Sequence, residues 1–451
     1  MRDLILFIII LISIPISFFR PYFGILMWTW ITFFNPHRFT WGFMYNSPVA
    51  AAVAVPTLLG CLFTSRINRN ILKLETLMLA GLWAWFGITF LHALQVPLFR
   101  EHLGDAKLEL ARVSKILLMT FIIMLLVTSR TRFKYLVVVT AACFGVLAMR
   151  GAIFGIRTGG ENRVFGPHDS FLTDNNAFAL AINMALPMFL FLARDEKRRN
   201  YRWLLYLAFI LGVISVVLTY SRGGLLGLVA VLLAIILKSR YKLISCFFVV
   251  LACVGVFAFA PPQWMSRMTG LARGEVDMSG RQRLVSWGTS WNFAMDYPIT
   301  GGSFNALPNV ELFQRYQPEP LPGGFLSSGP HSIYFQMLEE QGFVGLALYL
   351  FLVGSCWASL LSLRRRSGRS PLSQWIVPYT HMIEVSFLGF LVSGAFLGFA
   401  NFDLFYQLVA MVVILKIIYE KEMQPVLPVH LEQAEPVEVM GDTLLTQGVT
   451  E

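Results

Sequence analysis

Charged residues are scarce in this sequence. Asp, Glu, Lys and Arg together make up 14% of its 451 residues, whereas a soluble globular chain carries about 25%. Apolar residues make up 56%, and continuous apolar runs recur along almost the whole chain. So little charge cannot form a hydrophilic shell, which excludes a soluble enzyme, a disordered protein and a coiled coil. Because the apolar runs are continuous rather than alternating, a β-barrel is also disfavoured, and we expect an all-α polytopic membrane protein.

Several chemical motifs are missing as well. All five cysteines lie within apolar segments without a Cys-x-x-Cys pair, so we expect neither a disulfide nor a zinc site. The sequence contains no His-Glu-x-x-His, no Asp-x-Asp and no carboxylate cluster on one helix face. A Walker loop is absent too, which argues against ATP as an energy source. We therefore expect no metal and no cofactor.

Basic residues exceed acidic ones, with 36 Lys and Arg against 26 Asp and Glu and a formal net charge of +10. In a membrane protein such an excess is typical of cytoplasmic loops. We therefore expect membrane lipids, and no nucleic acid, as partners of the basic surface.

About twelve apolar runs approach the length of roughly 20 residues that a membrane span needs. They cover residues 4–34, 47–64, 75–95, 115–129, 135–152, 177–193, 203–220, 223–238, 243–260, 343–362, 380–399 and 404–419. The first run has a basic start but no small-residue cleavage site, so we interpret it as a retained signal-anchor. Arg20-Pro21 interrupts it, leaving open whether it forms one broken span or two.

Five basic clusters alternate with pairs of spans. They are Arg66/Arg69/Lys73, Arg130/Arg132/Lys134, Arg194/Lys197/Arg198/Arg199/Arg202, Lys238/Arg240/Lys242 and Arg364/Arg365/Arg366/Arg369. All five therefore fall on one side, which the positive-inside rule makes cytoplasmic. If residues 4–34 are one span, the N-terminus lies on that side too; if they are two, it lies outside.

The external side receives three segments of interest: residues 153–176, a tight turn at 220–224, and a long loop at 261–342 in which we expect short helices. Loops of that length without a role are uncommon. The acidic C-terminal residues 421–451 read as a disordered cytoplasmic tail.

Arg222 stands in the tight turn, on the side where the positive-inside bias disfavours it. Gly223 and Gly224 follow it and would let the backbone approach a ligand closely. The alternative is an arginine that reaches lipid headgroups.

The long loop contains the run Ser-Gly-Arg-Gln-Arg-Leu-Val-Ser-Trp at 279–287. The spacing places Arg281, Leu284 and Trp287 on one face of a short helix, which Ser279 could cap. Arg281 would then lie near a helix N-terminus, where anions bind. The alternative is an ordinary solvated pair formed by Arg281 and Arg283.

His331 follows Gly-Pro and opens a helix that enters the membrane at Phe343. A neutral imidazole at the membrane boundary can accept a proton, although a histidine that merely helps to cap the helix is the alternative. In the 153–176 loop, Asp174 can cap the next span. Arg163 there, and Arg150 just before it, are further candidates for binding an anion.

Taken in order, the SRGG turn, the SGRxxLxxW run and the PHSxYxQMLxExG-like helix start, preceded by NRVFGP and DNNAFAL, resemble the O-antigen ligase family, which shares a core with the O-antigen polymerases. The resemblance covers about residues 145–420, including the 261–342 loop. The N-terminal transmembrane region, residues 1–144 with PYFGILMWTW and NPHRFTWG, resembles family members linked to exosortase-type polysaccharide systems.

This resemblance implies an enzyme of the bacterial inner membrane that moves a glycan from undecaprenyl pyrophosphate to lipid A-core oligosaccharide, facing the periplasm and using no metal. The family's two arginines fall on Arg222 and Arg281, and its catalytic histidine falls on His331. Its acidic helix-start position falls on Glu340. Asn176 matches the family's amide, although Asp174-Asn175-Asn176 stands where Asp-Pro-Asn is expected.

The residue types suit this reaction. Guanidinium groups offer paired donors to a pyrophosphate leaving group and can replace a divalent metal. A neutral histidine can take the proton of an acceptor hydroxyl, and direct displacement inverts the anomeric centre. We expect Arg150, Arg163 and Arg283 to help bind the substrate.

Three rival functions remain open on the sequence alone. A polymerase would transfer the same donor to another lipid-linked glycan, and a protein O-oligosaccharyltransferase would transfer it to Ser or Thr. A flippase for the lipid-linked glycan would also need arginines, but it usually shows internal repeats, and none is visible here.

Overall fold

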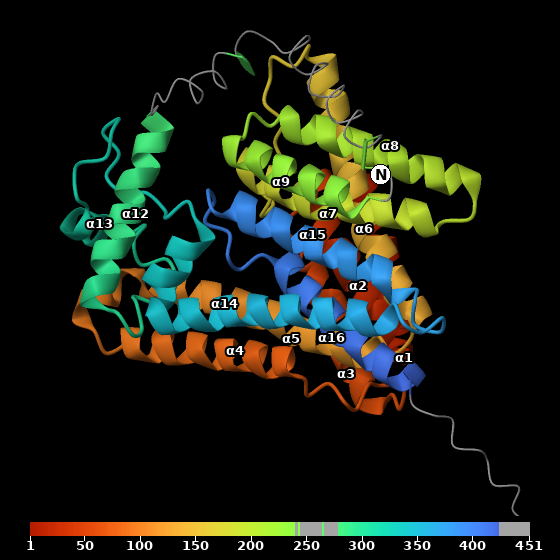
Figure 1. Cartoon of the computed structure of the whole chain (residues 1–451). Helices are drawn as coiled ribbons and strands as arrows, with labels where there is room; N and C mark the ends of the chain where they lie inside the picture. Colours follow the sequence, from red (N-terminus) through yellow and green to blue (C-terminus); the bar gives the residue numbers. More distant parts are fainter. Residues whose placement is uncertain (240–241, 244–263, 266–277, 424–451) are drawn as a thin grey trace, which may run out of the picture.

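The computed structural model describes residues 1–239, 242–243, 264–265 and 278–423 (Figure 1). The described part is helical and contains no strand. Nearly all of the predicted span at 243–260, and of the tail at 421–451, lies outside the described residues.

Each predicted span within the described residues coincides with at least one helix. The helices are α1 (Arg2–Phe19), α2 (Pro21–Phe34), α3 (Val49–Phe63), α4 (Leu74–Ala93), α5 (Leu103–Leu126), α6 (Arg130–Arg157), α7 (Asn175–Asp195), α8 (Arg199–Val217), α9 (Arg222–Lys238), α12 (Met278–Asp296), α13 (Val310–Tyr316), α14 (Ile333–Ser367), α15 (Ile376–Gly394) and α16 (Asp403–Met423), with short 3-10 turns η1 (Pro36–Phe39) and η2 (Pro97–His102). Among the described helices, 7 are long and apolar enough to cross a membrane, which confirms a polytopic all-α membrane protein.

The first apolar run folds as a hairpin of two helices. The backbone breaks at Arg20, and a Cβ on Gly24 would lie 3.1 Å from the Cβ of Ser17. A continuous helix would hold those two positions about 10 Å apart. At the other end of the hairpin, Asp3 accepts hydrogen bonds from the backbone N–H groups of Gly42 and Met44. The alternative of two helices is therefore the one that the structure adopts.

The centre of the bundle is built on α7, α15 and α16, whose side chains are buried on nearly all sides. A helix that is apolar all round belongs in such a position. Asn183 on α7 is a polar exception that ties the centre together, because its amide donates to the carbonyl of Gly224 at 2.8 Å and to Ser393 at 3.1 Å.

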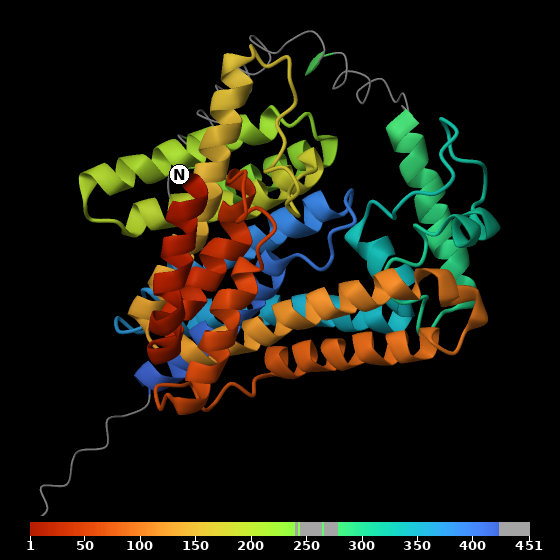
Figure 2. The same cartoon turned by 180° about the vertical axis from the view of Figure 1, so that it is seen from behind.

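The basic clusters lie at one end of the bundle, here called the basic end. Acidic side chains of other helices pair with them there: Glu384 lies 2.7 Å from Lys238 and 2.6 Å from Arg364, and Asp195 lies 2.8 Å from Lys134. The hairpin turn at Arg20 lies at this end, in a cleft that Arg66 and Arg132 also line. The N-terminus lies at the opposite end, here called the loop end, away from the end of α16 (Figure 2).

The described part of the long loop folds onto the loop end. There α4 and α5 extend side by side, and α12 and α13 pack near their connection (Figures 1 and 2). A second apolar core, which includes Phe99, Phe293 and Phe313, joins this connection to α12 and α13. The segment at Pro298 and Ile299 crosses α14 at Gly342, where the helix is interrupted. Gly342 has φ +66°, and the N–H of Phe343 donates to the carbonyl of Pro298 at 2.8 Å. A Cβ at Gly342 would lie 2.2 Å from the carbonyl oxygen of Ile299, so only glycine fits this crossing.

Candidate functional site

The SRGG turn is held between two helix starts. Ser221 caps α9 by accepting from the N–H of Gly224 at 2.9 Å, and its hydroxyl donates to the side-chain oxygen of Asn176 at 2.7 Å. Tyr220 has φ +60°, a conformation that costs a non-glycine residue about 1–3 kcal/mol. Asp174 caps α7, as predicted, accepting from the N–H of Asn176 at 2.6 Å. Arg222 therefore begins a helix whose first turn is fixed by its neighbours.

The two glycines after Arg222 serve packing. A Cβ at Gly223 would lie 2.8 Å from the Cβ of Phe396, and one at Gly224 would lie 2.5 Å from the Cβ of Ala179. Close packing of Phe396 and Ala179 therefore accounts for both glycines, and the close approach of a ligand to this backbone stays a prediction.

An aromatic stack brings the three motif segments together. Trp287 on α12 stacks on Phe335 of α14 with ring centroids 5.4 Å apart and lies 6.3 Å from Phe396. Phe396 in turn covers Gly223. The SRGG turn, the loop helix and the helix that follows His331 therefore meet around these three rings, although more than 100 residues separate the first segment from the last.

His331 lies just before α14 in a left-handed conformation, φ +46°, with its Nε2 3.2 Å from the hydroxyl of Ser328. Burial lowers its pKa below the usual range, the positive charge of Arg283 lowers it further, and Asp174 partly opposes the shift. The imidazole is therefore neutral at pH 7. A strained backbone and a neutral base at the meeting point of the motifs are typical of a catalytic position.

The two arginines of α12 differ in position. Arg281 is 61% exposed and its Nε lies 3.3 Å from a carboxylate oxygen of Glu319. Arg283 is less exposed and stands one turn before Trp287, and its charge acts on His331. Arg281, Leu284 and Trp287 lie in α12, as the spacing predicted, and Leu284 is exposed like Arg281. Ser279 lies inside α12 and does not cap it.

Arg150 and Arg163 line one cavity of about 240 Å³ between α6, α7 and the segment 163–167. The guanidinium of Arg150 lies 4.1 Å from the ring centre of Phe39. Burial raises the pKa of Tyr220, and the nearby charge of Arg163 opposes that rise. The N–H of Val164, which also lines this cavity, donates to the carbonyl of Leu218 at 3.0 Å, so the cavity adjoins the SRGG turn. Anion binding by Arg150 and Arg163 stays a prediction.

Glu340 lies apart from the arginines of the motifs. It is 2% exposed, and one carboxylate oxygen accepts from the N–H of Asn305 at 3.3 Å and from the amide of Gln336 at 3.2 Å. These hydrogen bonds connect Glu340 to Asn305 in the long loop and to Gln336 in α14, and not to the SRGG turn.

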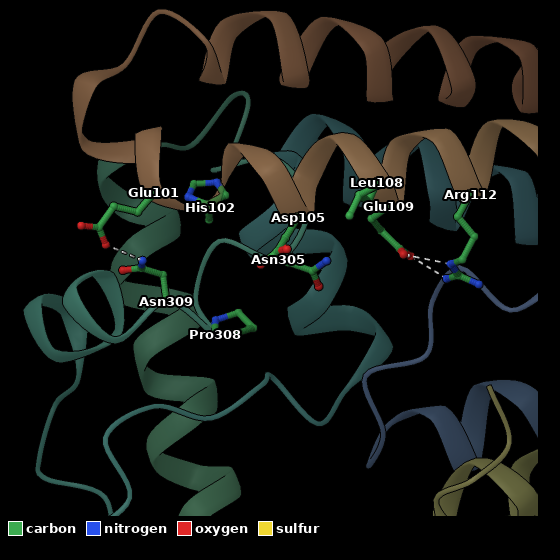
Figure 3. Close-up of a pocket in the computed structure, with 9 residues that line it drawn as sticks. All are labelled: Glu101, His102, Asp105, Leu108, Glu109, Arg112, Asn305, Pro308 and Asn309. Carbon is green, nitrogen blue, oxygen red and sulfur yellow. Dashed lines mark hydrogen bonds and ion pairs between the residues drawn. The ribbon is translucent and has the colours of Figure 1, made fainter. Parts of the chain in front are cut away.

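Sequence reasoning missed a second pocket at the loop end (Figure 3). It is lined by Glu101, His102, Asp105, Leu108, Glu109, Arg112, Asn305, Pro308 and Asn309. Four of the charged positions lie on α5 or just before it, in a stretch that the search for apolar runs passed over. The spacing of Glu101, Asp105 and Glu109 by four residues was the available signal, since it places them on one helical face. The expectation that no carboxylate cluster shares a helix face is therefore wrong, because these three residues line one pocket.

Comparison with known families yields two matches. Residues 1–197 match a family of unknown function, which leaves the resemblance to exosortase-linked members a prediction. No curated protein matches the chain. Residues 207–350 match the O-antigen ligase family, and Arg222, Arg281 and His331 all fall within them. The match confirms that residues 207–350, here called the O-antigen ligase domain after the matched family, resemble that family.

Proposed function

We propose that this protein transfers a glycan from undecaprenyl pyrophosphate to lipid A-core oligosaccharide at the periplasmic face of the inner membrane, a step of lipopolysaccharide biosynthesis. The observation that carries the proposal is the position of His331. It lies just before α14, where the three motif segments converge, and the charges of Arg283 and Asp174 act on its imidazole. The O-antigen ligase domain supports glycan transfer of the ligase or polymerase type.

In this proposal the arginines hold the donor pyrophosphate. Arg222 begins α9, where backbone N–H groups and the helix dipole favour an anion. Arg281 and Arg283 supply guanidiniums from α12, and Arg150 with Arg163 extend the basic surface toward α6. Paired N–H donors suit the oxygens of a phosphate, and they stabilise the charge that grows as the leaving group departs.

His331 acts as the general base. Its imidazole takes the proton of the acceptor hydroxyl as that oxygen attacks the anomeric carbon. The bond between the anomeric carbon and the pyrophosphate oxygen breaks, and the electron pair leaves with undecaprenyl pyrophosphate. The attack comes from the face opposite the leaving group, so the anomeric configuration inverts. A lowered pKa keeps the imidazole in the neutral form that the step needs.

Purified protein reconstituted in sealed lipid vesicles, given labelled lipid-linked glycan, tests this function. Separate reactions offer lipid A-core, a second lipid-linked glycan, or a protein with exposed Ser and Thr as acceptor. We expect label on lipid A-core. Label on the second donor would identify a polymerase, and label on the protein an O-oligosaccharyltransferase. Movement of donor across vesicles without covalent transfer would identify a flippase and refute the proposal.

A further inference from the structure

The pocket of Figure 3 has a volume of about 440 Å³, within the range of roughly 300–1,000 Å³ that is usual for small-ligand sites. One wall comes from η2 and the first turns of α5, within residues 1–197. The other wall is the segment 305–309 of the O-antigen ligase domain. The pocket thus lies between the two matched regions of the chain.

Hydrogen-bond acceptors dominate the α5 wall. Glu101, Asp105 and Glu109 line the pocket from this side; the carboxylate of Glu101 meets Asn309, and that of Glu109 points toward Arg112 (Figure 3). The amide of Asn309 donates to Glu101 at 3.1 Å, and Arg112 donates to both oxygens of Glu109 at 2.9 and 2.5 Å. These pairs fix the direction of the outer carboxylates, with Asp105 between them.

His102 adds a further acceptor. It is 3% exposed, and its Nε2 lies 2.9 Å from the carbonyl oxygen of Gly302. A carbonyl oxygen can only accept, so Nε2 carries the proton and Nδ1 keeps its lone pair. Within the part of the chain that the structure describes, that Nδ1 has no hydrogen-bond partner. A buried acceptor without a donor leaves the wall of the pocket that His102 lines with an unmet hydrogen bond.

The chemistry of the lining selects the ligand. The three carboxylates attract O–H or N–H donors. Arg112 is the one guanidinium among the described lining residues, and it is already paired with both oxygens of Glu109, so the lining disfavours a phosphate. A bound metal is not favoured either, because no group of three or more His, Cys, Asp or Glu among the described residues is arranged to hold one. Sugar hydroxyls supply many donors in a small volume and carry no negative charge.

We propose that this pocket binds an unphosphorylated sugar of the acceptor glycan, so that the N-terminal region takes part in acceptor recognition. The inference rests on the proposed function and adds to it. It also separates the two substrates by charge: the donor pyrophosphate is drawn to the arginines around the SRGG turn, and the acceptor sugar to the carboxylates of α5.

Three hydrogen bonds and one close backbone approach link the pocket to the segment of His331. Asn305, which lines the pocket and has φ +56°, donates through its N–H to Glu340. Gln336 donates to the same carboxylate and accepts from the N–H of Ala400 at 2.9 Å. Near Ala400, a Cβ on Gly398 would lie 3.5 Å from the backbone nitrogen of His331. An acceptor sugar in the pocket therefore lies beside the same loop and helix that position the base.

The test measures acceptor and donor constants separately. The purified full-length protein receives labelled lipid-linked donor and, as probe, core oligosaccharide released from lipid A and dephosphorylated. The variants are Asp105→Asn and Glu101→Gln. Glu311→Gln, an exposed position on α13 outside the pocket lining, is the matched control.

We expect Asp105→Asn and Glu101→Gln each to raise the acceptor KM about tenfold or more, since a hydrogen bond to a charged group contributes that much binding. The donor KM and the rate at saturating acceptor should stay near wild type, and Glu311→Gln should change nothing. An unchanged acceptor KM, or an effect confined to the donor KM, overturns the proposal.

Binding of the oligosaccharide alone, followed by saturation-transfer NMR, separates this inference from the proposed function. A protein that transfers nothing to lipid A-core but binds the oligosaccharide through Asp105 would refute the function and support the pocket. Transfer to the core, with binding that is insensitive to Asp105 and Glu101, would support the function and refute the pocket.

Discussion

Trp287 stacks on Phe335 with ring centroids 5.4 Å apart, and this contact joins the loop helix to the helix that follows His331. The same tryptophan lies 6.3 Å from Phe396, which packs on Gly223 beside Arg222. The site is therefore assembled by apolar contacts between segments that are far apart in the sequence. Its charged groups depend on this packing for their positions, which gives the first prediction.

Gly223→Ala should destabilise the protein by about 1–3 kcal/mol, the usual cost of adding a methyl group to a packed interface. The new Cβ would lie 2.8 Å from the Cβ of Phe396. Gly354→Ala is the control, because a Cβ there has nothing within 4 Å and sits inside α14, where alanine favours the helix. Thermal unfolding in detergent checks both; equal melting temperatures would contradict the packing role of Gly223.

The acid side of the pH–rate profile should report on His331. Its folded-state pKa is lowered, so transfer should fall only as the pH drops below the ordinary histidine value of about 6.5. Arg283→Ala removes a positive charge that disfavours the imidazolium, so it should shift the acid limb to higher pH. Arg281→Ala should leave that limb in place, since Arg281 pairs with Glu319. Equal shifts in both variants would contradict the assigned positions.

The N-terminus should be accessible from the same side as the long loop. The hairpin of α1 and α2 returns the chain to the loop end, where Tyr45 donates to Asp169 at 2.7 Å. A cysteine placed before Arg2 and another at Glu311 should react with an impermeant thiol reagent added to intact cells. A third at Lys197, at the basic end, should react only after lysis. Labelling of the N-terminal cysteine only after lysis would mean a single span.

Transfer should not require a divalent metal, since arginines take the place of the usual cation beside the pyrophosphate. Activity of the purified protein in EDTA should equal that in magnesium. Loss of turnover in chelator, restored by magnesium, would show that the arginines do not suffice.

The sequence predicted the spans where apolar runs are continuous, and it failed where charges interrupt them. We expected a span beginning at residue 115, but α5 begins at Leu103. The search for apolar runs missed the first turns of α5, because they carry the charges that line the pocket. The break at Arg20-Pro21 was visible, whereas its fold into a hairpin depends on contacts with α3 that no local pattern encodes.

The site residues divide in the same way. Motif order predicted Arg222 and His331 as site residues, and capping chemistry correctly predicted the role of Asp174. Arg281 ranked above Arg283 in the prediction, because spacing alone does not reveal which face of α12 meets α14. His102 and Asn305 had no local signal, since about 200 residues separate the two walls that they join.

The most direct measurement of the central claim is made on His331→Asn. Asparagine tolerates the left-handed conformation that His331 adopts but cannot act as a base near neutral pH, so the variant should fold. Donor affinity and transfer rate are measured on the same purified sample. The account predicts donor affinity within about twofold of wild type and a transfer rate lower by about 10² to 10⁴-fold. Transfer near the wild-type rate would show that His331 is structural and that the base lies elsewhere.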